Sequence, residues 1–164
     1  MKQLWSKRLL ALLIKHANAA AIVAVASTVS VSAQAATMTE ALVQNYASAM
    51  KLSANNQDVN QVARLVSDDA LISLSRKAKS TSLDKEAYLR LLQSSWSDTS
   101  NYRYDITVNN IVITGSQARA NVTTNESWIK DGQPVSFITN SRVTLTLSTG
   151  NAVLLRAVSQ VTIN

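Results

Sequence analysis

The sequence predicts an α+β domain in which three N-terminal helices pack on one face of an antiparallel β-sheet. Apolar residues repeat every three to four positions up to about residue 97, and they alternate with polar residues from Asn101 onward. The pair Asp131-Gly132 lies between two alternating segments, which is typical of a two-residue hairpin turn. Helices followed by consecutive hairpin strands indicate the α+β class.

Three helix starts are marked by side chains that can accept hydrogen bonds from free backbone N–H groups. Thr37 and Glu40 have the spacing of a capping box, and Asp58 and Asp84 precede the next two apolar repeats. The residues predicted to face inward from these helices are Leu42, Val43, Tyr46, Ala47 and Met50, then Val59, Val62, Ala63 and Val66, and finally Tyr88, Leu91, Leu92 and Trp96.

Short and long strands complete the predicted elements. A short strand at 70–74 follows the second helix, and the basic, polar segment 75–82 has room for another. The four longer strands are predicted at 102–114, 117–130, 133–147 and 152–163. Their turns are Gly115-Ser116, Asp131-Gly132 and Thr149-Gly150-Asn151.

The hairpin turns set which residues face each other across the last three strands. A two-residue turn at Asp131-Gly132 places Glu126 opposite Phe137 on the inward face. The same register brings together a patch of hydroxyl side chains in the middle of that face, with Glu126 at its edge. This patch consists of Thr124, Thr139, Ser141 and Ser159. The other inward positions of the last two strands are Val135, Val143, Leu145, Leu147, Val153, Leu155, Ala157, Val161 and Ile163.

The N-terminal segment has the pattern of a secretory signal peptide. Its only charges are basic, an apolar stretch from Ala17 to Val31 follows, and Ala33-Gln34-Ala35 matches a cleavage site. We therefore expect residues 1–35 to be a signal peptide, cleaved after Ala35, and residues 36–164 to be a periplasmic or secreted domain. The alternative is that the segment is retained as a membrane anchor, although its apolar stretch is shorter than the ~20 residues of a spanning helix.

Composition narrows the possible functions of the exported domain. Of the 16 Lys and Arg, four lie at positions 2, 7, 8 and 15, so residues 36–164 carry 12 Lys and Arg against all 10 Asp and Glu, a net charge of +2. This small charge argues against nucleic acid as a partner. The only histidine is His16 and there is no cysteine. Thiol nucleophiles, Ser-His-Asp triads, disulfides and histidine-rich metal sites are therefore excluded, and we expect no cofactor and no metal.

Two stretches of the domain resemble a known family. "ALVQNYASAM" and "LVSDDALISL", together with the order of the elements, are similar to the nuclear transport factor 2-like (polyketide-cyclase-like, cystatin-like) domains. The resemblance covers nearly all of residues 37–164 and implies a cone, in which a curved sheet wraps three helices and leaves a pocket between them. Proteins of this fold include isomerases, dehydratases, epoxide hydrolases, transport adaptors and secretion components, so the fold alone does not define an activity.

Ketosteroid isomerase offers the nearest enzymatic comparison. "LVQNYASAM" resembles its first helix, and Tyr46 falls where that family has its oxyanion-stabilising tyrosine. "SDDALISL" is similar to the segment that carries the catalytic aspartate, but the matching position here is Leu74. The resemblance therefore implies that this isomerase chemistry is lost.

The candidate site residues can be explained with or without catalysis. Glu126 can act as a general base, line the pocket mouth as a hydrated carboxylate, or pair with a basic residue of the strand ends (Lys130, Arg103 or Arg119). Tyr46 can donate a hydrogen bond to a ligand or pack in the core. Trp96 and Trp128 can line an aromatic cavity or serve core or dimer packing.

We expect a non-catalytic domain that binds a small apolar ligand or a protein partner in the pocket, with a homodimer formed through the outer sheet face. The predicted pocket residues are Tyr46, Trp96, Thr124, Glu126, Trp128, Thr139, Ser141 and Ser159. The alternatives are a cofactor-independent isomerase or hydrolase that uses Tyr46 and Glu126, and a membrane-anchored periplasmic component of a secretion system.

The first testable prediction concerns the N-terminus. We expect the exported protein to begin at Ala36, because Ala33-Gln34-Ala35 follows an apolar stretch too short to anchor well. N-terminal sequencing or intact mass of the exported form measures this directly. Recovery of the chain from membranes with Met1 in place would instead support the anchored alternative.

Overall fold

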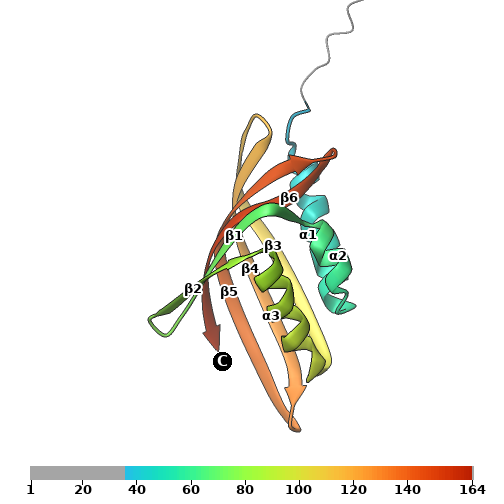
Figure 1. The fold of residues 1–164 in the computed structure, drawn as a ribbon, viewed down its shortest axis with the longest axis vertical. Coiled ribbons are helices and arrows are strands. Elements are labelled where there is room, and N and C mark those ends of the chain that lie inside the picture. Colours follow the sequence, from blue (N-terminus) through green and yellow to red (C-terminus); the bar gives the residue numbers. More distant parts are fainter. Residues whose placement is uncertain (1–35, 164) are drawn as a thin grey trace, which may run out of the picture. The chain divides into compact units, whose positions relative to one another are not determined.

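The structure is a computed structural model and describes residues 36–163, so the predicted signal peptide lies outside the described residues. The domain is α+β, with a six-stranded sheet and N-terminal helices (Figure 1). The helices are α1 (Glu40–Asn55), α2 (Val59–Arg64) and α3 (Lys85–Ser97). The strands are β1 (Val66–Arg76), β2 (Lys79–Asp84), β3 (Ser100–Thr114), β4 (Gln117–Lys130), β5 (Gln133–Ser148) and β6 (Asn151–Ile163).

The sheet has the strand order β2-β1-β6-β5-β4-β3 and is not closed into a barrel. All neighbouring strands are antiparallel except β1 and β6, which are parallel. The predicted purely antiparallel sheet is therefore wrong at this one pairing. β1 starts directly after α2, is longer than the predicted strand at 70–74, and lies beside the last strand of the chain rather than only beside β2.

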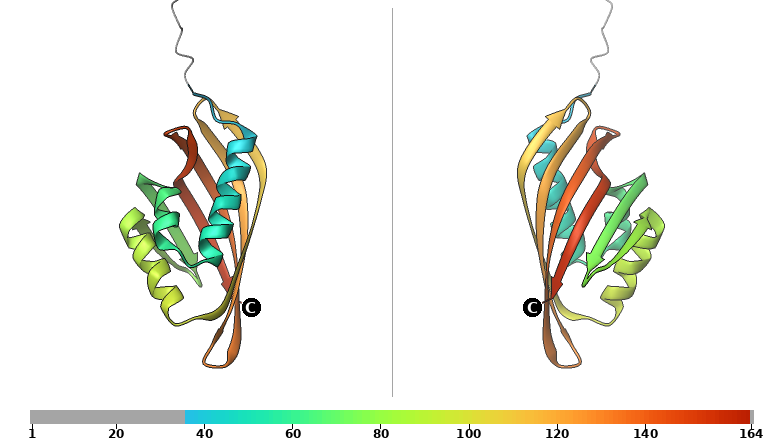
Figure 2. Two further views of the ribbon diagram at one scale, coloured as in Figure 1. Left: turned by 90° about the vertical axis from the view of Figure 1, so that its right-hand side faces the viewer. Right: turned by 90° about the vertical axis from the view of Figure 1, so that its left-hand side faces the viewer.

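The three helices of the described residues lie against one face of the curved sheet, and none of them lies on the opposite face (Figure 2). Asp58 and Asp84 cap α2 and α3 as predicted, each accepting hydrogen bonds from backbone N–H groups of the first turn. The first helix starts two residues later than predicted, because Thr39 rather than Thr37 accepts from the backbone N–H of Leu42.

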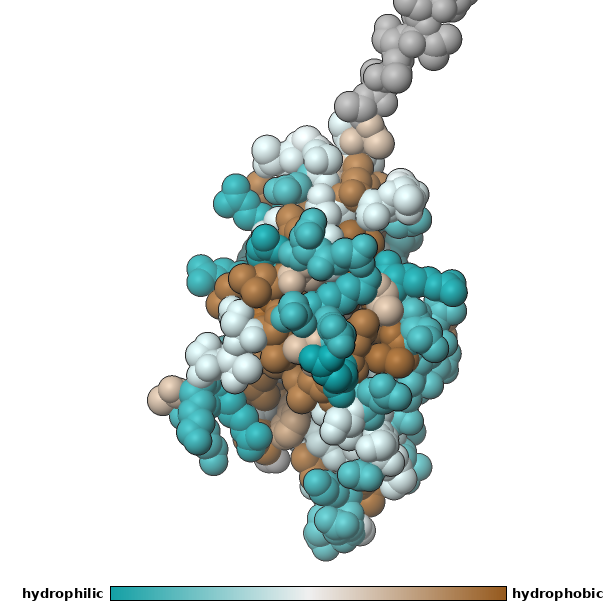
Figure 3. Space-filling model, in the orientation of Figure 1, coloured by the Kyte–Doolittle hydropathy of each residue, from teal (hydrophilic) through white to brown (hydrophobic). Residues whose placement is uncertain are grey.

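The core lies between the helices and the inward face of the sheet. It includes the predicted Val43, Tyr46, Met50, Val62 and Trp96. The prediction for α3 is wrong at one position, since Leu91 is 42% exposed while Leu89 packs against the core. In Figure 3, apolar side chains reach the surface in the middle of the view and polar side chains surround them. Within residues 36–163, no helix has the length and apolarity needed to span a membrane.

A β-bulge in β6 changes which residues of that strand face inward. Leu145 pairs with Leu154, whereas its neighbour Thr144 pairs with Arg156, so Leu155 is the extra residue. Leu154 is consequently buried at 5% exposure and belongs to the core, and the prediction that Leu155 faces inward is wrong. The turn before β6 is Thr149-Gly150, one residue shorter than predicted. The shorter turn and the extra residue compensate, so the predicted pairing of Ser141 with Ser159 is confirmed.

This bulge can be tested by substitution. Leu154→Ala should lower the free energy of unfolding by about 2–4 kcal/mol, because it removes a buried side chain from the core. Leu155→Ala is the matched control and should cost clearly less, since Leu155 is only partly buried. Urea unfolding followed by circular dichroism measures both. A larger loss for Leu155→Ala would mean that β6 continues without the bulge.

Candidate functional site

Alternating residues of β4 and β5 form the sheet side of the candidate site. The predicted register is confirmed: Glu126 pairs with Phe137 and Thr124 pairs with Thr139. The Asp131-Gly132 turn explains this, because both residues have positive φ (51° and 76°) and close a two-residue loop between Lys130 and Gln133.

A bulge in β3 sets which residues of β3 lie beside Glu126 and its neighbours on β4. Near its turn, β3 pairs Val112 with Arg119, but beyond the bulge it pairs Asn109 with Asn121. Asn110 lies in this bulge and has a φ of 54°, a conformation that asparagine tolerates better than most residues. The shift places Tyr104 opposite Glu126. Without it, continuation of the turn register would place Asp105 there, and two carboxylates would face each other.

Glu126 is the carboxylate of the site, and its one hydrogen-bond partner in the described residues is a tyrosine. The Tyr102 hydroxyl donates to Glu126 Oε2 at 2.7 Å. Burial raises the pKa of Glu126, and the hydrogen bond from Tyr102 partly offsets this. No ion pair within residues 36–163 includes Glu126, so the predicted alternative of a salt bridge to a strand-end residue is not what the structure shows.

All four tyrosines of the chain have a raised pKa, and three of them are affected by the charge of this carboxylate. Burial raises the pKa of Tyr46, Tyr88, Tyr102 and Tyr104. The negative charge of Glu126 raises the pKa further for the last three of them. Each hydroxyl therefore keeps its proton at neutral pH and is available as a hydrogen-bond donor.

An unbroken series of aromatic rings forms one wall of the site. Trp96 of α3 contacts Tyr102 of β3 edge-on, with ring centroids 5.9 Å apart. Tyr102 lies 6.2 Å from Trp128 of β4, and Trp128 lies 4.8 Å from Phe137 of β5. The indole Nε1 of Trp128 is buried, and it donates no hydrogen bond within the described part of the chain. It is a buried donor without an acceptor, on the same face of β4 as Glu126.

Of the remaining predicted residues, Tyr46 belongs to α1, and the four hydroxyl residues lie farther along the same sheet face. Ser141 and Ser159 hydrogen-bond to each other at 2.8 Å, so each supplies a partner for the other. Thr124 is 9% exposed and Thr139 is partly buried opposite it. Tyr46 is 6% exposed and packs in the core. Glu126 therefore hydrogen-bonds to an aromatic residue, Tyr102, whereas Ser141 and Ser159 hydrogen-bond to each other.

Four residues of the site were not among the predicted pocket residues, namely Tyr88, Tyr102, Tyr104 and Phe137. Alternation along 102–114 contains a signal for two of them, because Tyr102 and Tyr104 share one face with two apolar residues of the partly buried row, Ile106 and Val108. The bulge at Asn110 places that face of β3 on the same side of the sheet as Glu126, and no sequence pattern predicted this bulge.

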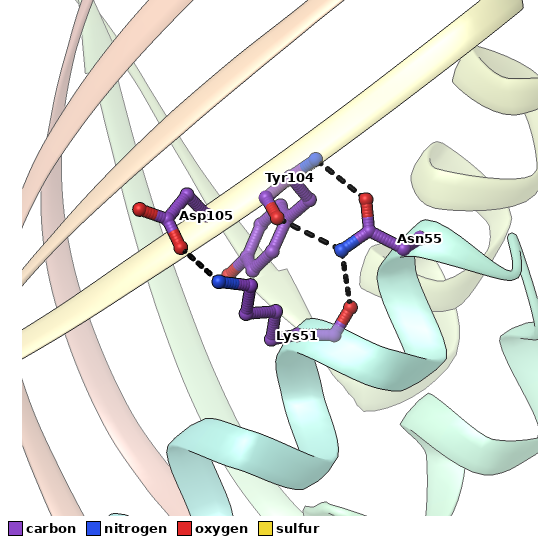
Figure 4. A network of polar contacts seen from close by, with 4 residues as sticks. All are labelled: Lys51, Asn55, Tyr104 and Asp105. Atoms are coloured by element: carbon purple, nitrogen blue, oxygen red, sulfur yellow. Dashed lines mark hydrogen bonds and ion pairs between the residues drawn. The ribbon is translucent and has the colours of Figure 1, made fainter.

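A polar network fixes the position of Tyr104 at the edge of the sheet (Figure 4). The Asn55 amide at the end of α1 donates to the carbonyl of Tyr104 at 2.8 Å and accepts from its N–H at 2.9 Å. One turn earlier, Lys51 Nζ lies 2.5 Å from a carboxylate oxygen of Asp105. Asn55 thus satisfies backbone groups of an edge strand that no further strand pairs with, and it holds α1 against β3.

Within residues 36–163, no group of three or more His, Cys, Asp or Glu side chains is placed to hold a metal ion. What the site offers is one partly buried carboxylate, protonated tyrosine hydroxyls, one unpaired indole donor and an aromatic wall.

Solved structures show which fold this arrangement belongs to. A conserved protein from Planctomyces limnophilus matches with a TM-score of 0.67 and 15% identity over 76% of this chain and 97% of that one. An NTF-2 like protein of unknown function from Silicibacter pomeroyi gives 0.52 and 11% over 76% and 94%. A ketosteroid isomerase-like protein from Erwinia carotovora atroseptica gives 0.58 and 16% over 74% and 94%. Neither a family model nor a curated protein matches the sequence. The likenesses show that this chain has the nuclear transport factor 2-like fold.

The raised pKa of Glu126 predicts a pH-dependent effect of its neutral analogue. A carboxyl whose pKa is higher in the folded state stabilises the fold below the unfolded value of about 4.5, and this stabilisation is lost as the pH rises through the folded value. Glu126→Gln should therefore gain stability relative to the wild type as the pH rises from about 4 to 8. Urea unfolding at several pH values measures the difference.

Tyr102→Phe tests the same pH dependence of stability with the carboxyl of Glu126 left in place. It removes the hydrogen bond that lowers the pKa of Glu126, so the pH range over which the wild-type carboxyl loses its stabilising effect should move upward. An equal stability difference between Glu126→Gln and wild type at pH 4 and pH 8 would mean that the carboxylate is fully hydrated.

Proposed function

We propose that this domain of the nuclear transport factor 2-like fold is an exported, non-catalytic binding domain for a small, largely apolar molecule that carries a hydroxyl group. The ligand would lie on the inward face of the sheet, beside Glu126 and the aromatic wall formed by Trp96, Tyr102, Trp128 and Phe137. Export rests on the signal-peptide pattern of residues 1–35.

The observation that carries this proposal is the buried, unpaired Nε1 of Trp128 on the same strand face as a carboxylate. A buried donor without an acceptor costs free energy, and a ligand acceptor would recover it. Glu126 accepts one hydrogen bond, from Tyr102, and has capacity for more. A single hydroxyl group matches both, because it can accept from the indole and donate to the carboxylate.

The aromatic wall supports an apolar body for the same ligand. The rings form a continuous contact series from α3 across three strands, and such surfaces favour aromatic or aliphatic rings. The absence of a cationic side chain bonded to Glu126 in the described residues argues against a ligand carboxylate, which would bring a second negative charge to the site.

A second candidate function is acid–base catalysis with Glu126 as the base and tyrosine hydroxyls as donors to a developing oxyanion. The raised pKa of Glu126 and its contact with Tyr102 favour this reading. Against it, the position that resembles the isomerase aspartate is Leu74, an apolar residue packed against the core. The ketosteroid isomerase-like neighbour is too distant in sequence to transfer an activity.

The binding function can be tested with 2-naphthol and its methyl ether, a pair that differs in the hydroxyl proton. Calorimetric titration of the full chain should show 2-naphthol binding roughly tenfold tighter, the effect of one hydrogen bond to a charged group. Trp128→Phe should weaken 2-naphthol binding, because it removes the indole donor while keeping an aromatic ring. Equal affinity for both compounds would contradict the proposed hydroxyl recognition.

Glu126→Gln separates binding from catalysis. For a binding site, the variant should keep the affinity for 2-naphthol to within about tenfold, ~1.4 kcal/mol. If Glu126 is a general base, a turned-over substrate should lose roughly 10²–10⁴ in rate with little change in affinity. Loss of turnover in both Glu126→Gln and Tyr46→Phe, with no fall in melting temperature, would establish the enzyme and exclude the binding role.

A further inference from the structure

The outward face of the sheet carries two adjacent rows of mostly polar side chains across its middle strands, in which the exposed Val158 is the apolar member. We call them the outer rows. The first consists of Asn109, Asn121, Arg142 and Val158, and the second of Thr107, Thr123, Asn140, Gln160 and Ser75. Successive members are paired neighbours on adjacent strands, so with strands ~4.8 Å apart the second row crosses five strands over about 19 Å.

The outer rows border a shallow groove of about 590 Å³. Amide side chains dominate its lining, since Asn109, Asn121, Asn140 and Gln160 are all exposed. The Thr123 hydroxyl donates to Asn140 Oδ1 at 3.0 Å. This bond orients the Asn140 amide and leaves its two N–H groups for another partner. No helix of residues 36–163 covers this face (Figure 2).

Arginines give the same surface a positive charge. Arg142 lies within the first outer row, and the next row toward the β6 turn contains Arg119, Thr144 and Arg156. Arg156 donates to the carbonyl of Asp69, whereas Arg119 and Arg142 form no ion pair within residues 36–163. The outer rows contain no carboxylate, so Arg142 has no negative side chain beside it within these rows.

The side chains present narrow the class of ligand. An extended peptide binds sheets by pairing with free backbone groups, but β4, β5 and β6 are paired on both sides. Single-stranded nucleic acid stacks on aromatic rings, and the outer rows have none. The homodimer expected from the sequence would pack a second copy on this face, and the same rows would then bring arginines close to arginines without carboxylates of the rows between them.

We infer that the outer rows bind an acidic oligosaccharide, of the uronic acid class. Amide and hydroxyl side chains each offer a donor and an acceptor, which matches sugar hydroxyl groups that do the same. The planar guanidinium of Arg142 can bind a carboxylate through two parallel hydrogen bonds. This site is on the face opposite Glu126, so it is independent of the proposed function.

Trigalacturonate and its methyl-esterified form test this inference, because esterification removes the charge and keeps the hydroxyl groups. Calorimetric titration of the full chain should detect trigalacturonate at millimolar or lower dissociation constant, with the ester at least tenfold weaker. Arg142→Gln should weaken trigalacturonate binding at least tenfold, the effect of a lost charged, bidentate contact. Asn121→Ala should weaken binding of both compounds, since it removes a hydroxyl partner.

Arg64→Gln is the matched control, because it removes the same charge from exposed α2 on the helical side of the sheet. It should leave binding unchanged. No binding at 10 mM, equal effects of Arg64→Gln and Arg142→Gln, or equal binding of triglutamate would each overturn the inference. The last result would identify the surface as a general anion site. Both arginines are exposed, and unchanged melting temperatures of the variants would confirm that folding is not the cause.

Discussion

The bulge at Asn110 in β3 is the constraint on which the inward site depends. It shifts the register between β3 and β4 by one residue, and a shift of one exchanges the two faces of a strand. Below the bulge, Tyr102 and Tyr104 face the helices beside Glu126, and Arg103 and Asp105 face outward. A regular hairpin would place Asp105 beside Glu126 and turn both tyrosines away from the core.

Glu126 is a largely buried carboxylate without a cationic partner in the described residues, so neighbouring hydrogen-bond donors must stabilise it. Removing a charged group from water is costly unless hydrogen bonds compensate, and the structure supplies a tyrosine hydroxyl rather than an arginine. The neighbouring tyrosines are themselves buried and protonated, so they offer dipoles without a neutralising charge. The hydrogen bond from Tyr102 offsets only part of the free-energy cost of burying the charged form of Glu126. The pKa of Glu126 is therefore raised, and its protonation depends on pH.

The two faces of the sheet differ in their side-chain chemistry because residues alternate along each strand. Inward positions carry aromatic and apolar side chains around one carboxylate, whereas outward positions carry amides, hydroxyls and guanidinium groups. Asn55 and Lys51 meet the sheet at the β3 edge and fix α1 against it. The aromatic wall and the outer rows can thus be changed separately, because no side chain belongs to both.

Local sequence determined the elements and much of the register of this protein. The caps at Asp58 and Asp84 and the Asp131-Gly132 turn act through bonds between near neighbours, so their patterns could be recognised directly. They were sufficient to place Glu126 opposite Phe137. Only the tertiary structure decided the parallel pairing of β1 with β6 and the bulges at Asn110 and Leu155. The parallel pairing joins segments far apart in the chain, and each bulge depends on how its strand packs against the rest of the fold. The bulge at Asn110 determines that tyrosines, rather than a second carboxylate, lie beside Glu126.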